Sequence, residues 1–458
     1  MLARLIEPRS SLPASRQHFS NRDLVCLIYP VVIEQFLALL VGMIDTMMIS
    51  NAGESAVSGV ALTNQLANVF ILVFTSLAAG GAVVASQYIG HGDREKGVTA
   101  SCQLLRIAGF VSLGISLVLF GLCTPVFDLL FGQVTPEVRS AGTRYLRIII
   151  CSFPFLALYN ACTALYRSMS HTREVMYTSI IMNVLNVIGN AIGIFVLHAG
   201  VEGVAYSTLI ARAVACLIML FGIRNKSLTL HIDRGVLHPV PDMRRRILRI
   251  AIPNALEHGL FHVAKVALSS LVALFGTIQI AANGVAQSFW SMSFLFNNAM
   301  APVFITVVGW YVGAGDLEGA DYSMRKLLRI TLLGSILWNV VFLALMPLIL
   351  GLYVLTPVTH ALVVRLCLIH NMADGILCPV SYSFADGLKA AGDVKFNLYA
   401  GIFSTVVCRV ILAWLLGLQL GLGVTGVAIA MVLDWAIKAS LTLARYRSRK
   451  WTQFHVLE

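Results

Sequence analysis

Long apolar runs separated by short polar stretches dominate the pattern of hydrophobic and polar positions along the chain. A membrane-spanning helix needs about 20 mainly apolar residues. Runs of about that length or more lie at residues 24–50, 58–88, 101–123, 144–166, 175–197, 203–223, 247–275, 283–312, 328–352, 360–384, 396–419 and 423–444. The alternating pattern of a transmembrane β-barrel is absent. The pattern therefore predicts an all-α membrane protein with twelve transmembrane helices.

The two halves of the chain repeat one another at an offset of about 223 residues. QYIGHGD at 87–93 returns as WYVGAGD at 310–316, and GVEGVA at 200–205 returns as GVTGVA at 423–428. In each GxGD loop we expect Gly to allow the sharp turn and Asp to cap the next helix. Six spans in each half give the halves the same orientation in the membrane. We therefore expect two pseudo-symmetric six-helix bundles.

The expected organisation follows from these spans. The bundles are joined by a basic linker, RNKSLTLHIDRGVLHPVPDMRRR, and the polar, basic N-terminus lacks a signal-peptide cleavage site. The predicted parts are an N-terminal tail at 1–23, an N-terminal bundle at 24–223, a linker at 224–246, a C-terminal bundle at 247–446 and a C-terminal tail at 447–458.

Composition and charge narrow the class of protein. Hydrophobic residues make up 58% of the chain and charged residues 12%, as in integral membrane proteins. The net charge of +11 is concentrated at both ends and in alternate loops, which follows the positive-inside rule. This distribution predicts a multi-pass protein of the cytoplasmic membrane with both termini in the cytoplasm. The positive charge is thus explained by membrane topology and lipid contact, and not by nucleic-acid binding. The predicted outer loop at 124–147 is an exception to this rule, because it carries three arginines.

Motifs for catalysis and cofactor binding are not found. The nine cysteines include no C-x-x-C pair and no His/Cys cluster, and the phosphate-binding motif GxxxxGK[ST] does not occur. No nucleophile with a neighbouring base is apparent in the sequence. We therefore expect neither an enzyme nor a bound cofactor.

Two carboxylates interrupt the first apolar run. A charge near the bilayer centre costs about 3 kcal/mol on insertion scales, so such residues are functional candidates. Glu34 and Asp45 are eleven residues apart and share one helix face. That face should point into the bundle, where protonation or cation binding at Asp45 would act as a switch. The alternative is that water near the interface solvates Asp45.

Three asparagines mark the fifth run. Asn183, Asn186 and Asn190 are spaced three and four residues apart, which makes a polar stripe on one helix face. An asparagine amide can donate to a carboxylate or accept from its protonated form, so the stripe suits a partner such as Asp45. The alternative is that these amides hold neighbouring helices together.

Charged residues in the second half supply further candidates. Glu257 and Lys265 are two turns apart on one run, so Lys265 can neutralise Glu257, or Glu34 in the other half, unless it binds substrate or an ion. Asp374 is an isolated carboxylate and a second candidate coupling site.

The twelfth run carries Asp434 and Lys438, an i, i+4 pair that we expect to neutralise itself. Arg212 and Arg409 have no evident local partner. They pair with acids on other helices or contact an anionic ligand.

These motifs resemble those of the multidrug and toxic compound extrusion family. Besides the GxGD loop, the resemblance includes P-x-x-x-E before the Asp of segment 1, GESAVSGVAL at 53–62, LKAAGDVKF at 388–396 and GVTGVAIAM at 423–431. The family implies a V-shaped pair of bundles that works by alternating access. It also implies export of cationic or amphipathic compounds in exchange for H+ or Na+.

The resemblance also implies roles for single residues. Asp45 falls on the family's segment 1 acid, while Asn186 and Asn190 fall on an N-x-x-x-D pattern with Asn in place of its Asp. Glu257 and Asp374 lie on the helices that carry acids in the sodium-coupled branch, which places a Na+ site near them. The coupling ion is therefore H+ or Na+.

The leading hypothesis is thus a monomeric secondary antiporter for small cationic or amphipathic substrates, in which Asp45 is the switch. A second is a flippase for lipid-linked precursors on the same fold, with Arg212, Arg409 and Lys265 binding a phosphate-bearing headgroup. A third is a membrane receptor or scaffold that moves no solute.

Overall fold

The computed structural model describes residues 6–8, 12–51, 53–132, 134–351, 353, 355–454 and 456–457. All regular elements in these residues are helices, as the apolar runs predict. Parts of the predicted N-terminal tail, 1–5 and 9–11, lie outside the described residues, as do parts of the C-terminal tail, 455 and 458.

Residues 22–255 form one compact unit, and 256–457 with the described residues before 22 form the other. The division falls within one helix, and the predicted bundle and linker boundaries stay a prediction. The helices of the first unit are α2 (Asn21–Ser50), α3 (Glu54–His91), α4 (Arg94–Gly121), α5 (Cys123–Phe131), α6 (Pro136–Ser168), α7 (Thr172–Ala191) and α8 (Gly200–Gly222). A π-helical turn, η2 (Ile192–Val196), continues α7, and a 3-10 turn, η3 (Arg234–Leu237), lies in the linker.

Helix α9 (Pro241–Ala273) crosses from the first unit into the second. The other helices there are α10 (Thr277–Ser293), α11 (Leu295–Gly313), α12 (Leu317–Leu350), α13 (Pro357–Cys378), α14 (Phe384–Ala390), α15 (Val394–Gly401), α16 (Val410–Trp414) and α17 (Gly423–Arg447). The π-helical turns are η4 (Pro379–Ser383), η5 (Ile402–Arg409) and η6 (Leu415–Gln419); the 3-10 turns are η1 (Ala14–Arg16) and η7 (Lys450–Gln453).

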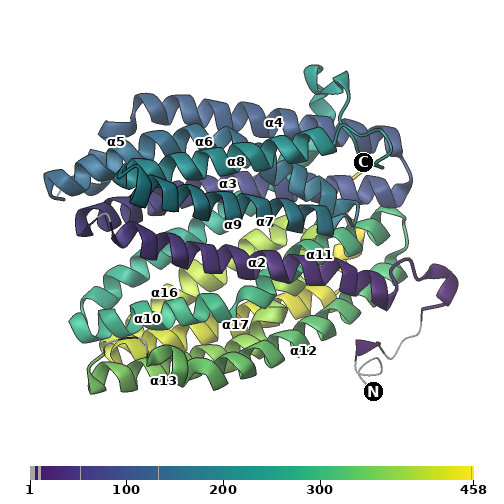
Figure 1. The fold of residues 1–458 in the computed structure, drawn as a ribbon. Coiled ribbons are helices and arrows are strands. Elements are labelled where there is room, and N and C mark those ends of the chain that lie inside the picture. Colours follow the sequence, from purple (N-terminus) through teal and green to yellow (C-terminus); the bar gives the residue numbers. More distant parts are fainter. Residues whose placement is uncertain are drawn as a thin grey trace. The chain divides into compact units, whose positions relative to one another are not determined.

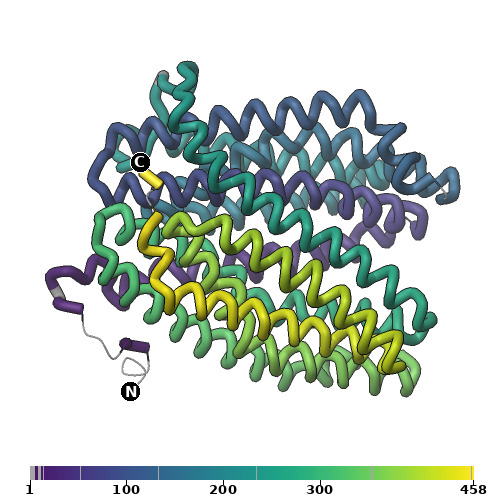
Figure 2. Tube along the Cα trace, turned by 180° about the vertical axis from the view of Figure 1, so that it is seen from behind, coloured from purple at the N-terminus to yellow at the C-terminus, as the bar shows by residue number. Residues whose placement is uncertain are grey.

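The two units pack their helices in the same pattern. In the first, α6 contacts α3, α4 and α8, and α8 also contacts α7 (Figure 1). In the second, α13 contacts α10, α12 and α17, and α17 also contacts α16 with the π-helical turns beside it (Figure 2). Each helix of one set is the repeat of the corresponding helix in the other. The predicted internal repeat is therefore confirmed as two units with equivalent packing.

Each unit has its own apolar core. Phe74, Phe127 and Phe153 are almost fully buried in the first, and Phe289 and Leu366 in the second. All of them except Phe127, which lies on α5 beside α6, lie on the helices that make the shared contacts. Apolar side chains on other faces, such as those of α4 and α12, are exposed in the protein, as expected for helices that face lipid.

The GxGD loops behave as expected. Gly92 and Gly315 have φ values of +78° and +75°, which glycine adopts without strain, and they lie in the turns that follow α3 and α11. The side chain of Asp93 accepts a hydrogen bond from the backbone N–H of Lys96, and Asp316 accepts one from Gly319 N–H. Both aspartates therefore cap the following helix.

Eleven helices of the described part are long and apolar enough to cross a membrane by length and composition. Helix α9 is not among them, since charged and histidine side chains interrupt its apolar run. The predicted eighth run, 283–312, is interrupted: α10 ends at Ser293 and α11 begins at Leu295.

The prediction of a loop at 124–147 is wrong for most of its length. Helix α5 occupies the first part, and α6 begins at Pro136, eight residues before the predicted start of its apolar run. Thr135 with Pro136 is a helix-start signal, because proline suits the first turn and lacks the N–H that would be left without a partner. Of the four residues between the two helices, 133 lies outside the described residues.

Candidate functional site

Asp45 lies at the centre of a polar network in the first unit. It extends from α2 toward α7, where the Nδ2 of Asn190 donates to Asp45 Oδ1 at 2.7 Å. The hydroxyl of Ser207 on α8 donates to Asn190 Oδ1, which turns the amide nitrogen toward the carboxylate. Asn186 and Asn190 are buried, so α2, α7 and α8 together hold these groups away from bulk water. The expected contact with Asp45 is therefore confirmed for Asn190.

Asn186 can serve Asp45 in either protonation state. When its amide is oriented to satisfy both neighbours, the nitrogen lies 2.9 and 3.1 Å from the two Asp45 oxygens, and Thr208 Oγ1 donates to its oxygen at 3.1 Å. In the opposite orientation the amide oxygen faces Asp45 and the nitrogen donates to Thr208. The first orientation suits a charged carboxylate, and the second suits a protonated one that donates.

A cavity of about 150 Å³ adjoins the Asp45 carboxylate. Asn64 and Tyr145 also line it. The guanidinium of Arg212 donates to Ser152 Oγ at 2.7 Å and interacts electrostatically with Asp45. Asp45 is therefore reachable by a small cation or by water, and its negative charge is partly balanced from α8.

The structure brings neither Glu34 nor Asn183 into the Asp45 network. Arg167 at the end of α6 donates to Glu34 at 2.6 Å. The Nδ2 of Asn183 is buried and has no partner among the described residues. The expectation that Lys265 neutralises Glu34 is wrong, because the partner comes from a neighbouring helix of the same unit.

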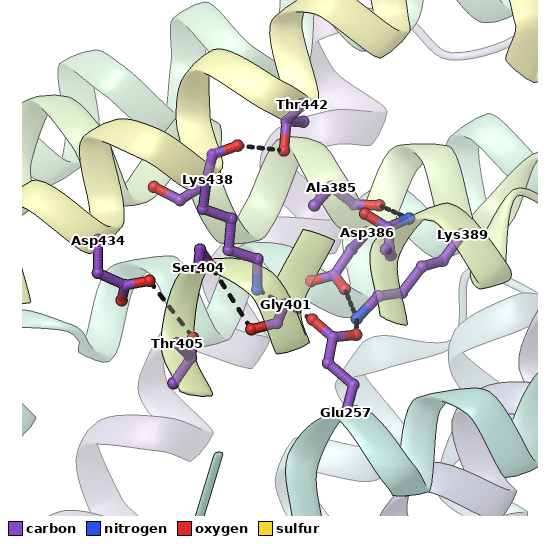
Figure 3. A network of polar contacts seen from close by, with 12 residues as sticks. Glu257, Ala385, Asp386, Lys389, Gly401, Ser404, Thr405, Asp434, Lys438 and Thr442 are labelled. Atoms are coloured by element: carbon purple, nitrogen blue, oxygen red, sulfur yellow. Dashed lines mark hydrogen bonds and ion pairs between the residues drawn. The ribbon is translucent and has the colours of Figure 1, made fainter. Parts of the chain in front are cut away.

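Glu257 lies in a second network, within the other unit (Figure 3). Its two oxygens lie 2.9 Å from Lys438 Nζ and 2.9 Å from Lys389 Nζ, and Lys389 also lies 3.3 Å from Asp386. The group holds two negative and two positive side chains, so it is neutral. The expectation that Lys265 neutralises Glu257 is wrong, since Lys438 and Lys389 reach it from α17 and α14.

Arg409 and Asp434 form a buried ion pair. Nε and Nη2 of Arg409 lie 2.9 and 2.5 Å from Asp434 Oδ2, and the side chains are 2% and 0% exposed. The predicted pair between Asp434 and Lys438 is wrong. Lys438 instead points to Glu257, as Figure 3 shows. A guanidinium satisfies a buried carboxylate with more than one N–H, which favours Arg409 as the partner.

Asp374 is fully buried on α13 and accepts a hydrogen bond from Asn339 Nδ2 at 3.0 Å. Its other oxygen has no hydrogen-bond partner among the described residues. The structure keeps Asp374 and Glu257 in separate networks. Both Glu257 oxygens already contact lysine ammonium groups, and the described residues contain no cluster of three His, Cys, Asp or Glu able to hold a metal.

Sequence reasoning missed the lysines and the arginine that pair with these acids. Arg167 and Lys389 lie at the ends of apolar runs, where basic residues are usually explained by the positive-inside rule. Only the helix packing shows that they turn inward.

Comparison with known proteins identifies the fold family. The family model described as MatE matches residues 30–192 and 253–415, which is most of the chain. The chain belongs to the MATE family. The two matched stretches are repeats of one another, so the MATE pattern is present once in each unit. MATE proteins are membrane carriers, which agrees with the multi-pass helical architecture.

Similar proteins extend over nearly the whole MATE chain. The uncharacterized transporter YisQ of Bacillus subtilis (strain 168) is 27% identical over 446 residues, which covers 94% of this chain and 95% of YisQ. The probable multidrug resistance protein NorM of Thermotoga maritima is 23% identical over 457 residues, covering 98% and 96%. A solved MOP superfamily transporter from Pyrococcus furiosus has a TM-score of 0.87 at 19% identity, covering 93% and 95%, and supports the fold.

Proposed function

We propose that this MATE protein is a secondary active antiporter that exports organic cations or amphipathic compounds in exchange for H+ bound at Asp45. The observation that carries the proposal is the Asp45 carboxylate beside a cavity, with the Asn190 amide 2.7 Å away and Asn186 able to serve both protonation states. Membership of a family of carriers supports the transport part of the proposal.

Protonation of Asp45 changes which partners it needs. The charged form accepts N–H bonds from Asn190 and Asn186, while the protonated form donates to an oxygen of Asn186. The α2, α7 and α8 contacts can therefore exist in two arrangements, and an ion can favour one only through its different affinity for the two. A charge moved through the whole membrane field gains about 2.3 kcal/mol per 100 mV, enough to bias such a change.

The donors around Asp45 favour H+ over Na+. Ser207 turns the Asn190 nitrogen, not its oxygen, toward the carboxylate. A sodium ion needs several oxygen ligands, so it would require this amide to turn over, whereas a proton needs a single oxygen lone pair. In the other unit, Na+ at Glu257 would have to displace two lysine ammonium groups.

The engaged arginines argue against a lipid-linked precursor flippase. Arg409 is neutralised by Asp434, and Arg212 donates to Ser152 near Asp45. The three cationic side chains expected to bind a phosphate headgroup therefore do not act as one group.

The distribution of Lys and Arg supports a cytoplasmic membrane location with both termini cytoplasmic. Since one chain contains both repeats, we propose that the protein functions as a monomer.

The proposal is tested by efflux from proteoliposomes loaded with tetramethylrhodamine methyl ester, a fluorescent organic cation. A pH gradient and a sodium gradient are imposed separately, and protein-free liposomes measure leakage. We expect the pH gradient alone to drive efflux. Efflux driven only by the sodium gradient would show that the coupling ion is Na+ and not H+. Absence of efflux under either gradient would contradict the proposal that the protein is an antiporter.

A further inference from the structure

The repeat places a second cavity in the other unit at the position of the Asp45 cavity. The same offset that relates the two GxGD loops relates Asp45 to Leu268, Asn64 to Gln287 and Asn186 to Arg409. Leu268, Gln287 and Arg409 line a cavity of about 40 Å³. The acid of the first unit is thus replaced by an apolar residue, and one amide by a guanidinium.

Lys265 gives this second cavity a net positive charge. It also lines the cavity, less than one turn from Leu268 on α9. Its ammonium makes no ion pair or hydrogen bond with the part of the chain that the structure describes. The charge of Arg409, by contrast, is balanced by Asp434. An ammonium without a counter-ion at the edge of a cavity leaves its charge available to an anionic ligand, and a charge-assisted hydrogen bond to a carboxylate is about twice as strong as a neutral one.

The remaining lining indicates the chemistry of that partner. Ser269 and Asn283 supply polar atoms, and Phe261 and Trp290 supply aromatic surface. The Arg409 guanidinium lies 5.2 Å from the Phe261 ring centre, which keeps that ring at the cavity. A cavity that binds benzene has about 150 Å³, and about 10–15 Å³ is enough for one water molecule, so about 40 Å³ holds a small charged group and no ring. The rest of a ligand would extend past the exposed side chain of Lys265.

We propose that Lys265 binds the anionic group of a transported amphipath, such as an aromatic carboxylate that also carries a positive charge. The inference rests on the proposed export function and names a substrate class for it: zwitterionic amphipaths. The ammonium supplies the charge, Gln287 and Asn283 can donate N–H bonds to carboxylate oxygens, and the aromatic residues contact the adjoining ring.

The test compares two dyes that differ by one group. Tetramethylrhodamine has a free carboxylate and is zwitterionic, whereas its methyl ester is a cation. Equilibrium binding of each to the purified full-length protein is measured by fluorescence anisotropy, for the wild type, Lys265→Gln and the charge-preserving Lys265→Arg. We expect Lys265→Gln to weaken binding of the zwitterion about tenfold and of the ester less than about twofold. Lys265→Arg should bind the zwitterion within about threefold of the wild type.

Three outcomes would overturn the inference. Lys265→Gln could weaken binding of both dyes equally, it could affect neither, or the wild type could fail to bind the zwitterion. Binding does not depend on ion-driven movement. The two proposals can therefore fail separately. If Lys265→Gln weakens binding of the zwitterion alone, this site is supported. If the same protein exports the ester under neither gradient, the antiporter proposal is contradicted. Melting temperatures of the three proteins check that each is folded.

Discussion

At the scale of single residues, the two repeats use equivalent positions for different chemistry. Asp45 beside Asn186 in one unit corresponds to Leu268 beside Arg409 in the other. The first arrangement leaves a carboxylate that an ion can neutralise. The second contains its own cation, which is paired internally with Asp434. Under the proposed function, the charge that changes during transport is that of Asp45, in the first unit.

Asn190→Ala should change the ion dependence of efflux. Its N–H bond stabilises the charged form of Asp45, and a hydrogen bond to a charged group contributes about 1.5–3 kcal/mol. We expect the pH for half-maximal efflux of the rhodamine ester to move upward by about one unit or more. The control is Asn183→Ala on the same helix, which lies outside the Asp45 network. Similar pH profiles for the two variants would contradict the role of Asn190.

The pair of Arg409 and Asp434 should show strong coupling. Arg409→Met or Asp434→Leu alone leaves one charge buried without its counter-ion, which costs about 3–5 kcal/mol. The double variant removes both charges, so we expect its melting temperature to recover most of the loss. Thermal unfolding of the purified proteins measures this. Additive losses in the double variant would show that the two charges do not stabilise one another.

The sequence predicts some of these contacts and not others. The spacing of Asn186 and Asn190 places them on one helix face, and an amide suits a carboxylate, so Asp45 could be named as a partner from the sequence. That α2 lies beside α7 comes from the fold. The partners of Glu34 and Glu257 depend on which helices pack together and on how far a long basic side chain reaches. Those facts depend on tertiary structure. For this reason Arg167 and Lys389 were not assigned, and Lys438 was paired with Asp434 instead of Glu257.

At the scale of helices, close backbone contacts hold each unit together at equivalent places. A Cβ on Gly203 of α8 would lie 2.8 Å from Gly193 Cα in η2, and a Cβ on Gly426 of α17 would lie 2.6 Å from the Leu416 carbonyl carbon in η6. Both contacts join a π-helical turn to the next helix, and η2 begins two residues after Asn190. The helix that carries Asn190 is therefore fixed against α8 just beyond the Asp45 network.

Gly203→Ala and Gly426→Ala should both destabilise the protein. The atoms that the new methyl group would meet belong to backbone, which cannot move aside as a side chain can. Overpacking of this kind costs about 1–3 kcal/mol, so we expect clearly lower melting temperatures. The control is Gly114→Ala on α4, where a Cβ meets no atom within 4 Å. Unchanged melting of the first two variants would contradict the close contacts.

Asp93→Ala should lower the melting temperature through loss of the α4 cap. The backbone N–H and then the ammonium of Lys96 hold the pKa of the partly exposed Asp93 below its usual value. A lowered folded-state pKa gives stability that is complete above the unfolded value of about 3.9 and is lost as pH falls through the folded value. The difference from wild type should therefore be equal at pH 6 and pH 8. Asp93→Asn, which still caps, should retain most of the stability; an equal loss in both variants would contradict the cap.

Element boundaries were less predictable than their number. Hydropathy alone merged α10 and α11 into one run, because the break at Phe294 changes the backbone and not the apolar character. Conversely, hydropathy hid the start of α6, whose first turns are charged. The Asp caps of the GxGD loops, which act locally, were predicted correctly, and Thr135 with Pro136 is a similar local signal that was not used.

At the scale of the whole molecule, a duplicated six-helix unit has acquired two different polar interiors. Both units keep the same helix contacts, and the MATE pattern matches each of them once. One interior contains a carboxylate with exchangeable partners and the other contains internally balanced ion pairs with an additional lysine. This asymmetry supports an antiporter in which one unit responds to the ion and the other contributes to substrate selection.

The central claim is that Asp45 couples an ion gradient to export, and the most direct test is Asp45→Asn. Efflux of the rhodamine ester from proteoliposomes is driven by a pH gradient in sodium-free buffer, and dye binding is measured on the same preparation. We predict that Asp45→Asn folds and binds the ester within about threefold of the wild type but loses gradient-driven efflux by at least about tenfold, because its charge can no longer change. A variant that pumps as well as the wild type would contradict the account.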